Sequence, residues 1–190
     1  EKDYQLASGL SDEVESDDSL WDMTRARLPW LLIGLFGGLA GAYVIGVFDI
    51  ERFPSMALFI PLIAAMGGNV GVQSAAIVVQ GLAAGRNPRD ERLFPRLLKE
   101  FSVALLNGAI CSAVILGASL ALGYGWNLSV TVSLALIAVI IFAALFGTFV
   151  PLTLDRFKID PALATGPFIT TANDIIGLII YFSIGVMMSA

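Results

Sequence analysis

The chain has 190 residues, of which 57% are hydrophobic and 14% are charged. Soluble domains carry about a quarter charged residues, so this composition predicts an integral membrane protein with a single domain. The sequence contains no histidine, which excludes histidine-ligated zinc, a Ser-His-Asp triad and a haem histidine ligand. Its single cysteine, Cys111, excludes an intrachain disulfide and a cysteine-based metal site.

Residues 1–27 are expected to form an acidic cytoplasmic segment ahead of the membrane domain. Residues 1–22 hold eight acidic groups and one lysine, which accounts for the net charge of −5. Such a segment is either a solvated linker or a collector of cations near a pore mouth. The chain begins at Glu1 without a methionine and with nothing like a cleaved signal peptide, so we expect a fragment of a longer protein.

Five apolar stretches predict an all-α polytopic membrane protein, because a spanning helix needs about 20 apolar residues. The expected spans are about 28–48, 55–85, 101–122, 129–154 and 167–189, which makes residues 28–190 one five-helix domain. Pro29 falls in the first turn of the first expected span, where its missing N–H is not needed. The second span exceeds a straight crossing, so it has to tilt, break or protrude.

Basic residues predict the orientation in the membrane. Three basic clusters fall on one side when five spans alternate: Arg25 with Arg27, the segment 86–99, and Arg156 with Lys158. We therefore expect a multi-pass protein of the inner (plasma) membrane, with the N-terminus in the cytoplasm and the C-terminus outside.

The first expected span is rich in glycine. The pairs Gly34–Gly38 and Gly37–Gly41 have the small-xxx-small spacing that lets helices approach closely. This pattern predicts tight packing, within a bundle or in a dimer.

Asp174, in "FITTANDIIGLIIYF", is the carboxylate that lies well inside an expected span, about 12 Å from its cytoplasmic end. A buried carboxylate is costly, and no basic residue inside any expected span could neutralise it. Its partner would be a proton, a wet path or a bound cation. Thr170, Thr171 and Asn173 add oxygen donors that suit a hard cation such as Mg²⁺ or Ca²⁺. The alternative is a protonated, hydrogen-bonded packing residue.

The stretch "AAMGGNVGVQSAA", residues 64–76, is polar and glycine-rich within the second span. Its glycines, together with Pro61 upstream, would weaken the helix, so we expect the second helix to be broken or kinked. Freed backbone carbonyls beside Asn69 could then bind a cation at membrane depth. The alternative is a kink that only packs helices.

These segments resemble the transmembrane domain of the MgtE magnesium channels. The resemblance rests on "RARLPWLL", "PLIAAMGGNVGVQSAAIVVQGLAAG" and "DPALATGPFITTANDIIGLIIYF", and it covers the chain from Arg25 to the C-terminus in a single order. The Gly-Gly-Asn-x-Gly-x-Gln-Ser stretch is its most specific part. "LASGLSDEVE" is similar to the linker that such proteins place between cytosolic CBS domains and the first membrane helix.

The resemblance implies a homodimer in the lipid bilayer, with a pore on the dimer axis lined by helices two and five. It implies that hydrated Mg²⁺, the transported ion, is held by a carboxylate, an Asn and nearby backbone carbonyls. The candidate ion-binding residues are Asp174, Asn69, Thr170, Gly68, Ala65 and Asn173. Cytosolic N-terminal and CBS domains close the pore in such proteins when internal Mg²⁺ is high. This sequence does not contain them, and the resemblance implies that CBS-type regulatory domains could accompany it in a full-length protein.

Three functions remain open from the sequence. The first is a Mg²⁺-selective channel domain, driven by the membrane potential and without an ATP motif. The second is an ion-coupled secondary transporter of divalent cations that exchanges them for Na⁺ or H⁺. The third is a structural membrane module in which Asp174 is protonated. An enzyme is least expected, because the membrane interior holds no nucleophile–base pair, and no nucleic-acid partner is expected.

Overall fold

The computed structural model describes residues 9–11, 14–48, 54–84 and 93–189. All regular structure in this part of the chain is helical, which confirms the all-α prediction. Five of its helices are long and apolar enough to cross a membrane: α2 (Leu20–Val47), α4 (Ile60–Ala83), α5 (Leu93–Ala121), α6 (Trp126–Arg156) and α7 (Pro167–Ser189). Two short elements, α3 (Pro54–Ala57) and the 3-10 helix η2 (Pro161–Ala164), precede α4 and α7.

Two helices begin earlier than the sequence predicted. α2 starts at Leu20, where Ser19 caps it by accepting a hydrogen bond from the backbone N–H of Asp22 at 3.3 Å. Pro29 therefore lies inside α2, and its expected place in the first turn is wrong. α5 likewise starts at Leu93, so charged residues that the sequence placed outside the spans are part of the helices.

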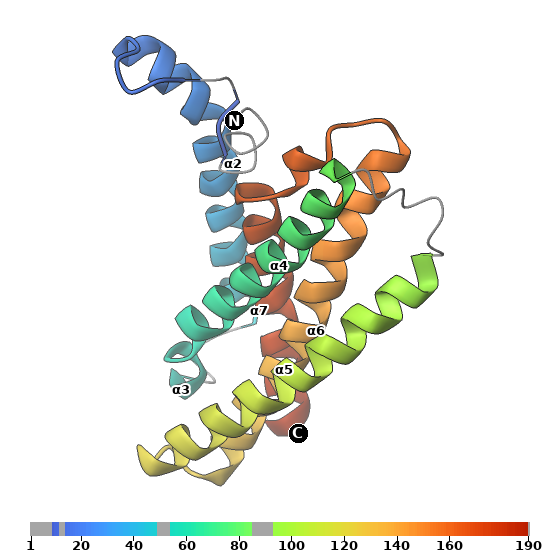
Figure 1. Cartoon of the computed structure of the whole chain (residues 1–190). Helices are drawn as coiled ribbons and strands as arrows, with labels where there is room; N and C mark the ends of the chain where they lie inside the picture. Colours follow the sequence, from blue (N-terminus) through green and yellow to red (C-terminus); the bar gives the residue numbers. More distant parts are fainter. Residues whose placement is uncertain (1–8, 12–13, 49–53, 85–92, 190) are drawn as a thin grey trace.

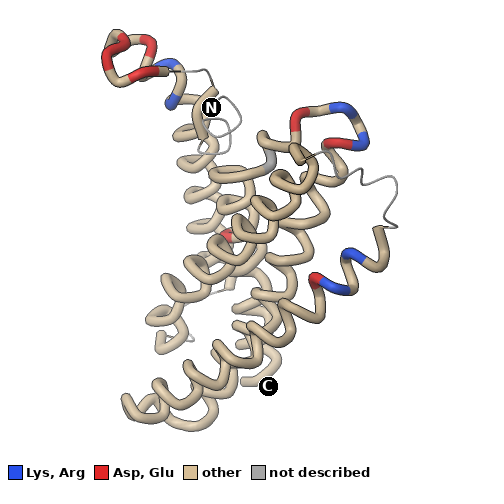
Figure 2. Tube along the Cα trace, viewed as in Figure 1, with Lys and Arg blue, Asp and Glu red and all other residues tan. Residues whose placement is uncertain are grey.

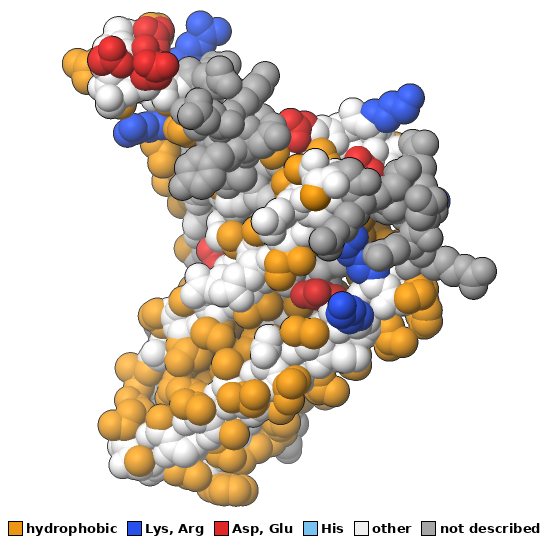
Figure 3. Space-filling model, viewed as in Figure 1, with side chains coloured by type: hydrophobic (Ala, Val, Ile, Leu, Met, Phe, Trp, Pro, Cys, Tyr) orange, Lys and Arg blue, Asp and Glu red, His pale blue; other side chains and the backbone are white. Residues whose placement is uncertain are grey.

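The helices form a central group with one helix on each flank (Figure 1). α4, α6 and α7 pack against one another, while α2 packs mainly on α7 and α5 mainly on α6. α2 and α5 consequently expose much of their apolar surface, and apolar side chains gather over the second half of α5 at the uncharged end of the molecule (Figure 3). Such a surface is suited to lipid contact.

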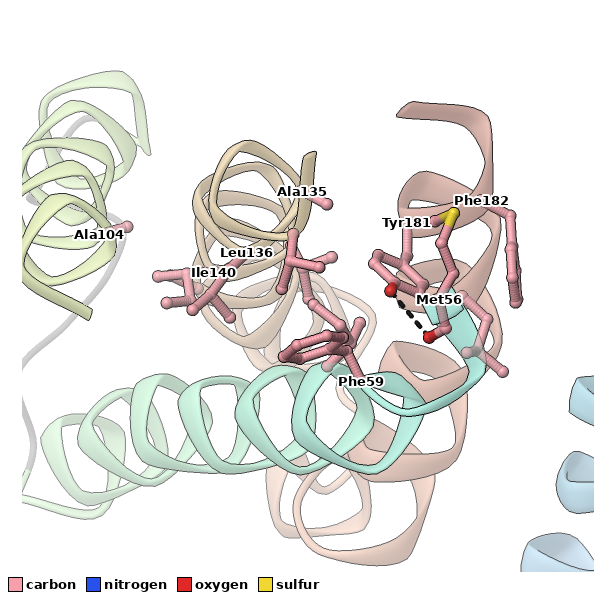
Figure 4. Packing of buried hydrophobic residues seen from close by; sticks show 13 residues of the cluster. Met56, Phe59, Ala104, Ala135, Leu136, Ile140, Tyr181 and Phe182 are labelled. Atoms are coloured by element: carbon pink, nitrogen blue, oxygen red, sulfur yellow. Dashed lines mark hydrogen bonds between the residues drawn. The ribbon is translucent and has the colours of Figure 1, made fainter. Parts of the chain in front are cut away.

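The corner between α3 and α4 is anchored on the second half of α7 (Figure 4). The Tyr181 hydroxyl donates a hydrogen bond of 2.9 Å to the backbone carbonyl of Met56, and both residues are buried. Phe59 packs its ring on Tyr124 at 5.2 Å between centroids. The anchored corner fixes where α4 enters the bundle.

The polar motif of residues 64–76 lies inside a continuous helix, so the predicted break at this motif is wrong. The chain is interrupted ahead of it, at Leu58–Phe59, between α3 and α4. The glycines allow close approach instead. A Cβ on Gly147 of α6 would collide with the backbone of Gly71, including its carbonyl carbon at 3.0 Å. The packing interpretation therefore accounts for Gly71, while a kink in α4 stays a prediction.

Candidate ion site

Asp174 lies about two turns into α7, half-buried, and is separated from all other charged residues of the described chain in Figure 2. Thr170 sits one turn before it on the same face. Both face Gly68 of α4: a Cβ on Gly68 would lie 3.5 Å from Thr170 Cγ2 and 3.9 Å from Asp174 Oδ1. The structure thus brings together three of the predicted site residues, Gly68, Thr170 and Asp174.

The start of α7 is fixed by a turn with local caps. Asp160 caps η2 by accepting a hydrogen bond of 2.9 Å from the Ala162 N–H, and Gly166 adopts a φ of 60° just before Pro167 opens α7. The Thr170 hydroxyl donates to the Pro167 carbonyl at 3.1 Å. Its proton is engaged, so toward a cation this hydroxyl offers its remaining lone pairs.

Asn173 lies on a different face of α7. Its side chain is 1% exposed and packs against Gly71 of α4. Neither polar atom of its amide has a hydrogen-bond partner within the described residues. The structure therefore does not bring Asn173 to the surface that holds Asp174, and its role as an ion ligand stays a prediction.

Asn69 and Ala65 lie one turn apart on an exposed face of α4, which Gln73 continues. Gly68 is the neighbour of Asn69 in sequence and lies between this face and Asp174. A polar residue exposed in the middle of a spanning helix is costly in lipid. We therefore expect this face of α4 to be covered by another protein surface or to line a water-filled path.

A cavity of about 790 Å³ adjoins Asp174, between the first halves of α2 and α7. Its lining is Gly9, Leu10, Arg27, Trp30, Leu31, Gly34, Gly166, Pro167, Thr170, Thr171 and Asp174. Because α2 begins at Leu20, Arg25 and Arg27 belong to a membrane helix. Both precede the expected span of residues 28–48, so the prediction that no basic residue inside an expected span neutralises Asp174 stays a prediction.

A hydrogen bond between α4 and α5 was not predicted from the sequence. The Ser74 hydroxyl of α4 donates a hydrogen bond of 2.6 Å to Glu100 Oε1 of α5. Ser74 belongs to the polar motif, but its partner stood just outside the span expected from residue 101. The contact could not be predicted from the sequence because the start of α5 at Leu93, which places Glu100 inside the helix, was not predicted.

Comparisons with known proteins identify the family of the chain. Residues 60–184 match the MgtE family, described as divalent cation transporter. The chain belongs to the MgtE family. This confirms the resemblance drawn from the motifs, since the matched range contains both α4 and Asp174.

Curated members of the MgtE family align with almost the whole chain. The proteins named magnesium transporter MgtE of Bacillus subtilis and Enterococcus faecalis are 34% and 33% identical to it, each over 97% of the chain and 41% of their own length. The protein of that name from Thermus thermophilus is 33% identical over 94% of the chain and 40% of its own length. The chain therefore spans about two fifths of the length of these relatives.

Proposed function

We propose that this chain is a Mg²⁺-selective channel domain, in which hydrated ions pass along α4 and α7 at the axis of a homodimer. The observation that carries the proposal is Asp174, a half-buried carboxylate in a membrane helix that faces Gly68 and a cavity. The relatives named magnesium transporters support Mg²⁺ as the ion.

The chemistry of the site suits a hydrated ion better than a bare one. The described residues contain no group of three or more His, Cys, Asp or Glu side chains that could enclose a metal ion. Mg²⁺ gives up its water reluctantly and is often held through one or two carboxylates. Two copies of Asp174 across a two-fold axis would supply about two negative charges, so symmetry makes one carboxylate per chain sufficient.

The exposed face of α4 is where we place the second subunit. Ala65 and Asn69 lie on this face, and Gly68 connects it to Asp174. A symmetric partner would cover these residues and enclose a path whose walls carry the Asn69 amide oxygen and backbone carbonyls. Thr170 would add an oxygen close to Asp174, whereas Asn173 has the weakest support as a ligand because its amide is buried elsewhere.

The driving force would be the membrane potential. A unit charge gains about 2.3 kcal/mol per 100 mV, so a divalent ion gains about 4.6 kcal/mol on entering a cell at that potential. No coupled reaction is needed for uptake at this scale. The channel interpretation therefore requires nothing beyond a path and an ion site.

The test is Mg²⁺ uptake into liposomes that contain the purified protein, followed with an enclosed Mg²⁺ indicator while the voltage is set by a K⁺ gradient and valinomycin. We expect uptake that rises with inside-negative voltage. The uptake should not require a Na⁺ or pH gradient, so it should persist when Na⁺ and pH are equal on both sides. Uptake that occurs only with a Na⁺ or pH gradient would contradict the channel and support the coupled transporter. Liposomes without protein are the control.

A further inference from the structure

The cavity beside Asp174 carries a basic residue at its other end. On α2 its lining follows one helical face, at Arg27, Trp30, Leu31 and Gly34. Among the described residues that line the cavity, Arg27 and Asp174 are the charged ones. We take this cavity as the part of the proposed path that continues from Asp174 toward the start of α2, so a cation on that path passes the guanidinium group of Arg27.

Arg27 is too distant to neutralise Asp174 directly. It precedes Gly37 by ten residues of α2, and Gly37 packs on Thr171 of α7, about one turn before Asp174. Since α2 and α7 begin at the same end of the molecule (Figure 1), the backbone positions of the two residues are separated by roughly 20 Å along the helices. Any effect of Arg27 is therefore on ions in transit.

We propose that Arg27 favours inward over outward movement of divalent cations by repelling them at the cytoplasmic mouth of this cavity. The inference rests on the proposed function and on a cytoplasmic start of α2. An ion that enters from the cytoplasm meets the positive charge before it can reach the carboxylate. An ion that arrives from outside is bound at Asp174 first and passes Arg27 only on leaving.

The size of the effect follows from electrostatics. A unit charge about 8 Å from the path changes the local concentration of a divalent ion about fourfold at an ionic strength of about 0.01 M, and about twofold at about 0.15 M. For a monovalent ion the factor is roughly the square root of these values.

Arg25 provides a matched control on the same helix. It is exposed, carries the same charge and lies about 200° around the helix from Arg27, outside the cavity lining. The substitutions Arg25→Gln and Arg27→Gln remove equal charge from the same end of the molecule. Only Arg27→Gln removes a charge from the lining of the cavity.

The experiment measures Mg²⁺ currents in inside-out membrane patches, where the cytoplasmic face is exposed to the bath. In Arg27→Gln we expect the outward current to rise about fourfold at about 0.01 M ionic strength and about twofold at about 0.15 M. Arg27→Lys and Arg25→Gln should behave like the wild type. An unchanged inward current in Arg27→Gln shows that this variant folds and conducts.

Two results would overturn the inference, and they have different causes. If Arg27→Gln and Arg25→Gln give the same outward current, the cavity position of Arg27 has no role, although the channel itself stands. If the wild type carries no Mg²⁺ current that Asp174→Asn removes, the proposed function fails and the inference fails with it.

Discussion

At the scale of single residues, two side chains of the polar motif face opposite ways. Asn69 is exposed on α4, whereas Ser74 is 5% exposed and bonded to Glu100 of α5. The exposed Asn69 amide is available to a ligand or a partner subunit, whereas the Ser74 hydroxyl is already hydrogen-bonded. Within this motif we therefore propose ion binding for Asn69 and helix packing for Ser74.

Replacing Asn69 by alanine should weaken Mg²⁺ binding and leave the fold intact. A net hydrogen bond contributes about 0.5–1.5 kcal/mol, so the Mg²⁺ concentration for half-maximal uptake should rise about two- to tenfold. Gln80→Ala is the control, because Gln80 is an exposed amide about three turns further along α4. A variant that no longer assembles, or one with unchanged affinity, would show that Asn69 is not a ligand.

At the scale of helices, glycines decide which elements touch. Gly37 and Gly41 of α2 contact Thr171 and Leu178 of α7, while a Cβ on Gly34 would meet nothing within 4 Å. Only one of the two glycine pairs expected in this helix is therefore used within the chain. Gly147 of α6 lies against the backbone of Gly71, so α4 and α6 meet backbone to backbone at this point.

Replacing Gly147 by alanine should destabilise the bundle. The new methyl group would meet the backbone of Gly71, which cannot rotate away, and overpacking of this kind costs about 1–3 kcal/mol. Gly117→Ala is the control, since a Cβ there meets nothing within 4 Å and alanine favours the helix. Thermal unfolding in detergent should give a lower midpoint for Gly147→Ala alone; equal midpoints would refute the close crossing.

At the scale of the whole molecule, charge is concentrated at one end (Figure 2). Charged residues occur at the start of α2, around the end of α6 and in the first turns of α5, where they reach about the middle of the molecule, while the other end is uncharged. α7 finishes at the other end (Figure 1). With the preference of basic residues for the cytoplasm, this distribution supports the predicted orientation.

Cysteine labelling in intact cells tests this orientation. With Cys111 replaced by serine, Ser189→Cys should react with a membrane-impermeant maleimide from outside. Lys158→Cys should react only after the cells are permeabilised, because Lys158 follows the end of α6, which lies at the end of the molecule opposite the end of α7 (Figure 1). The reverse pattern would invert the orientation and would place Arg27 at the outer mouth.

The sequence predicted the number of spanning helices and the place of Asp174, because a charge-free stretch and a lone carboxylate are local signals. It did not predict the start of α2, since the charged residues before residue 28 concealed a helix that Ser19 caps. It misread the glycines of α4, because a glycine that weakens a helix and one that admits a neighbour look the same without Gly147 opposite. Burial of Asn173 likewise depends on contacts between helices that the sequence alone does not contain.

The most direct test of the account is Mg²⁺ uptake by Asp174→Asn at a fixed inside-negative voltage, measured beside Glu100→Gln. Both changes remove one carboxylate charge, but Glu100 is bonded to Ser74 and glutamine keeps an oxygen acceptor for that bond. We expect Asp174→Asn to lower uptake at least about tenfold, which corresponds to about 1.4 kcal/mol, and Glu100→Gln to retain it. Uptake by Asp174→Asn at the wild-type rate would contradict the assignment of Asp174 as the ion site.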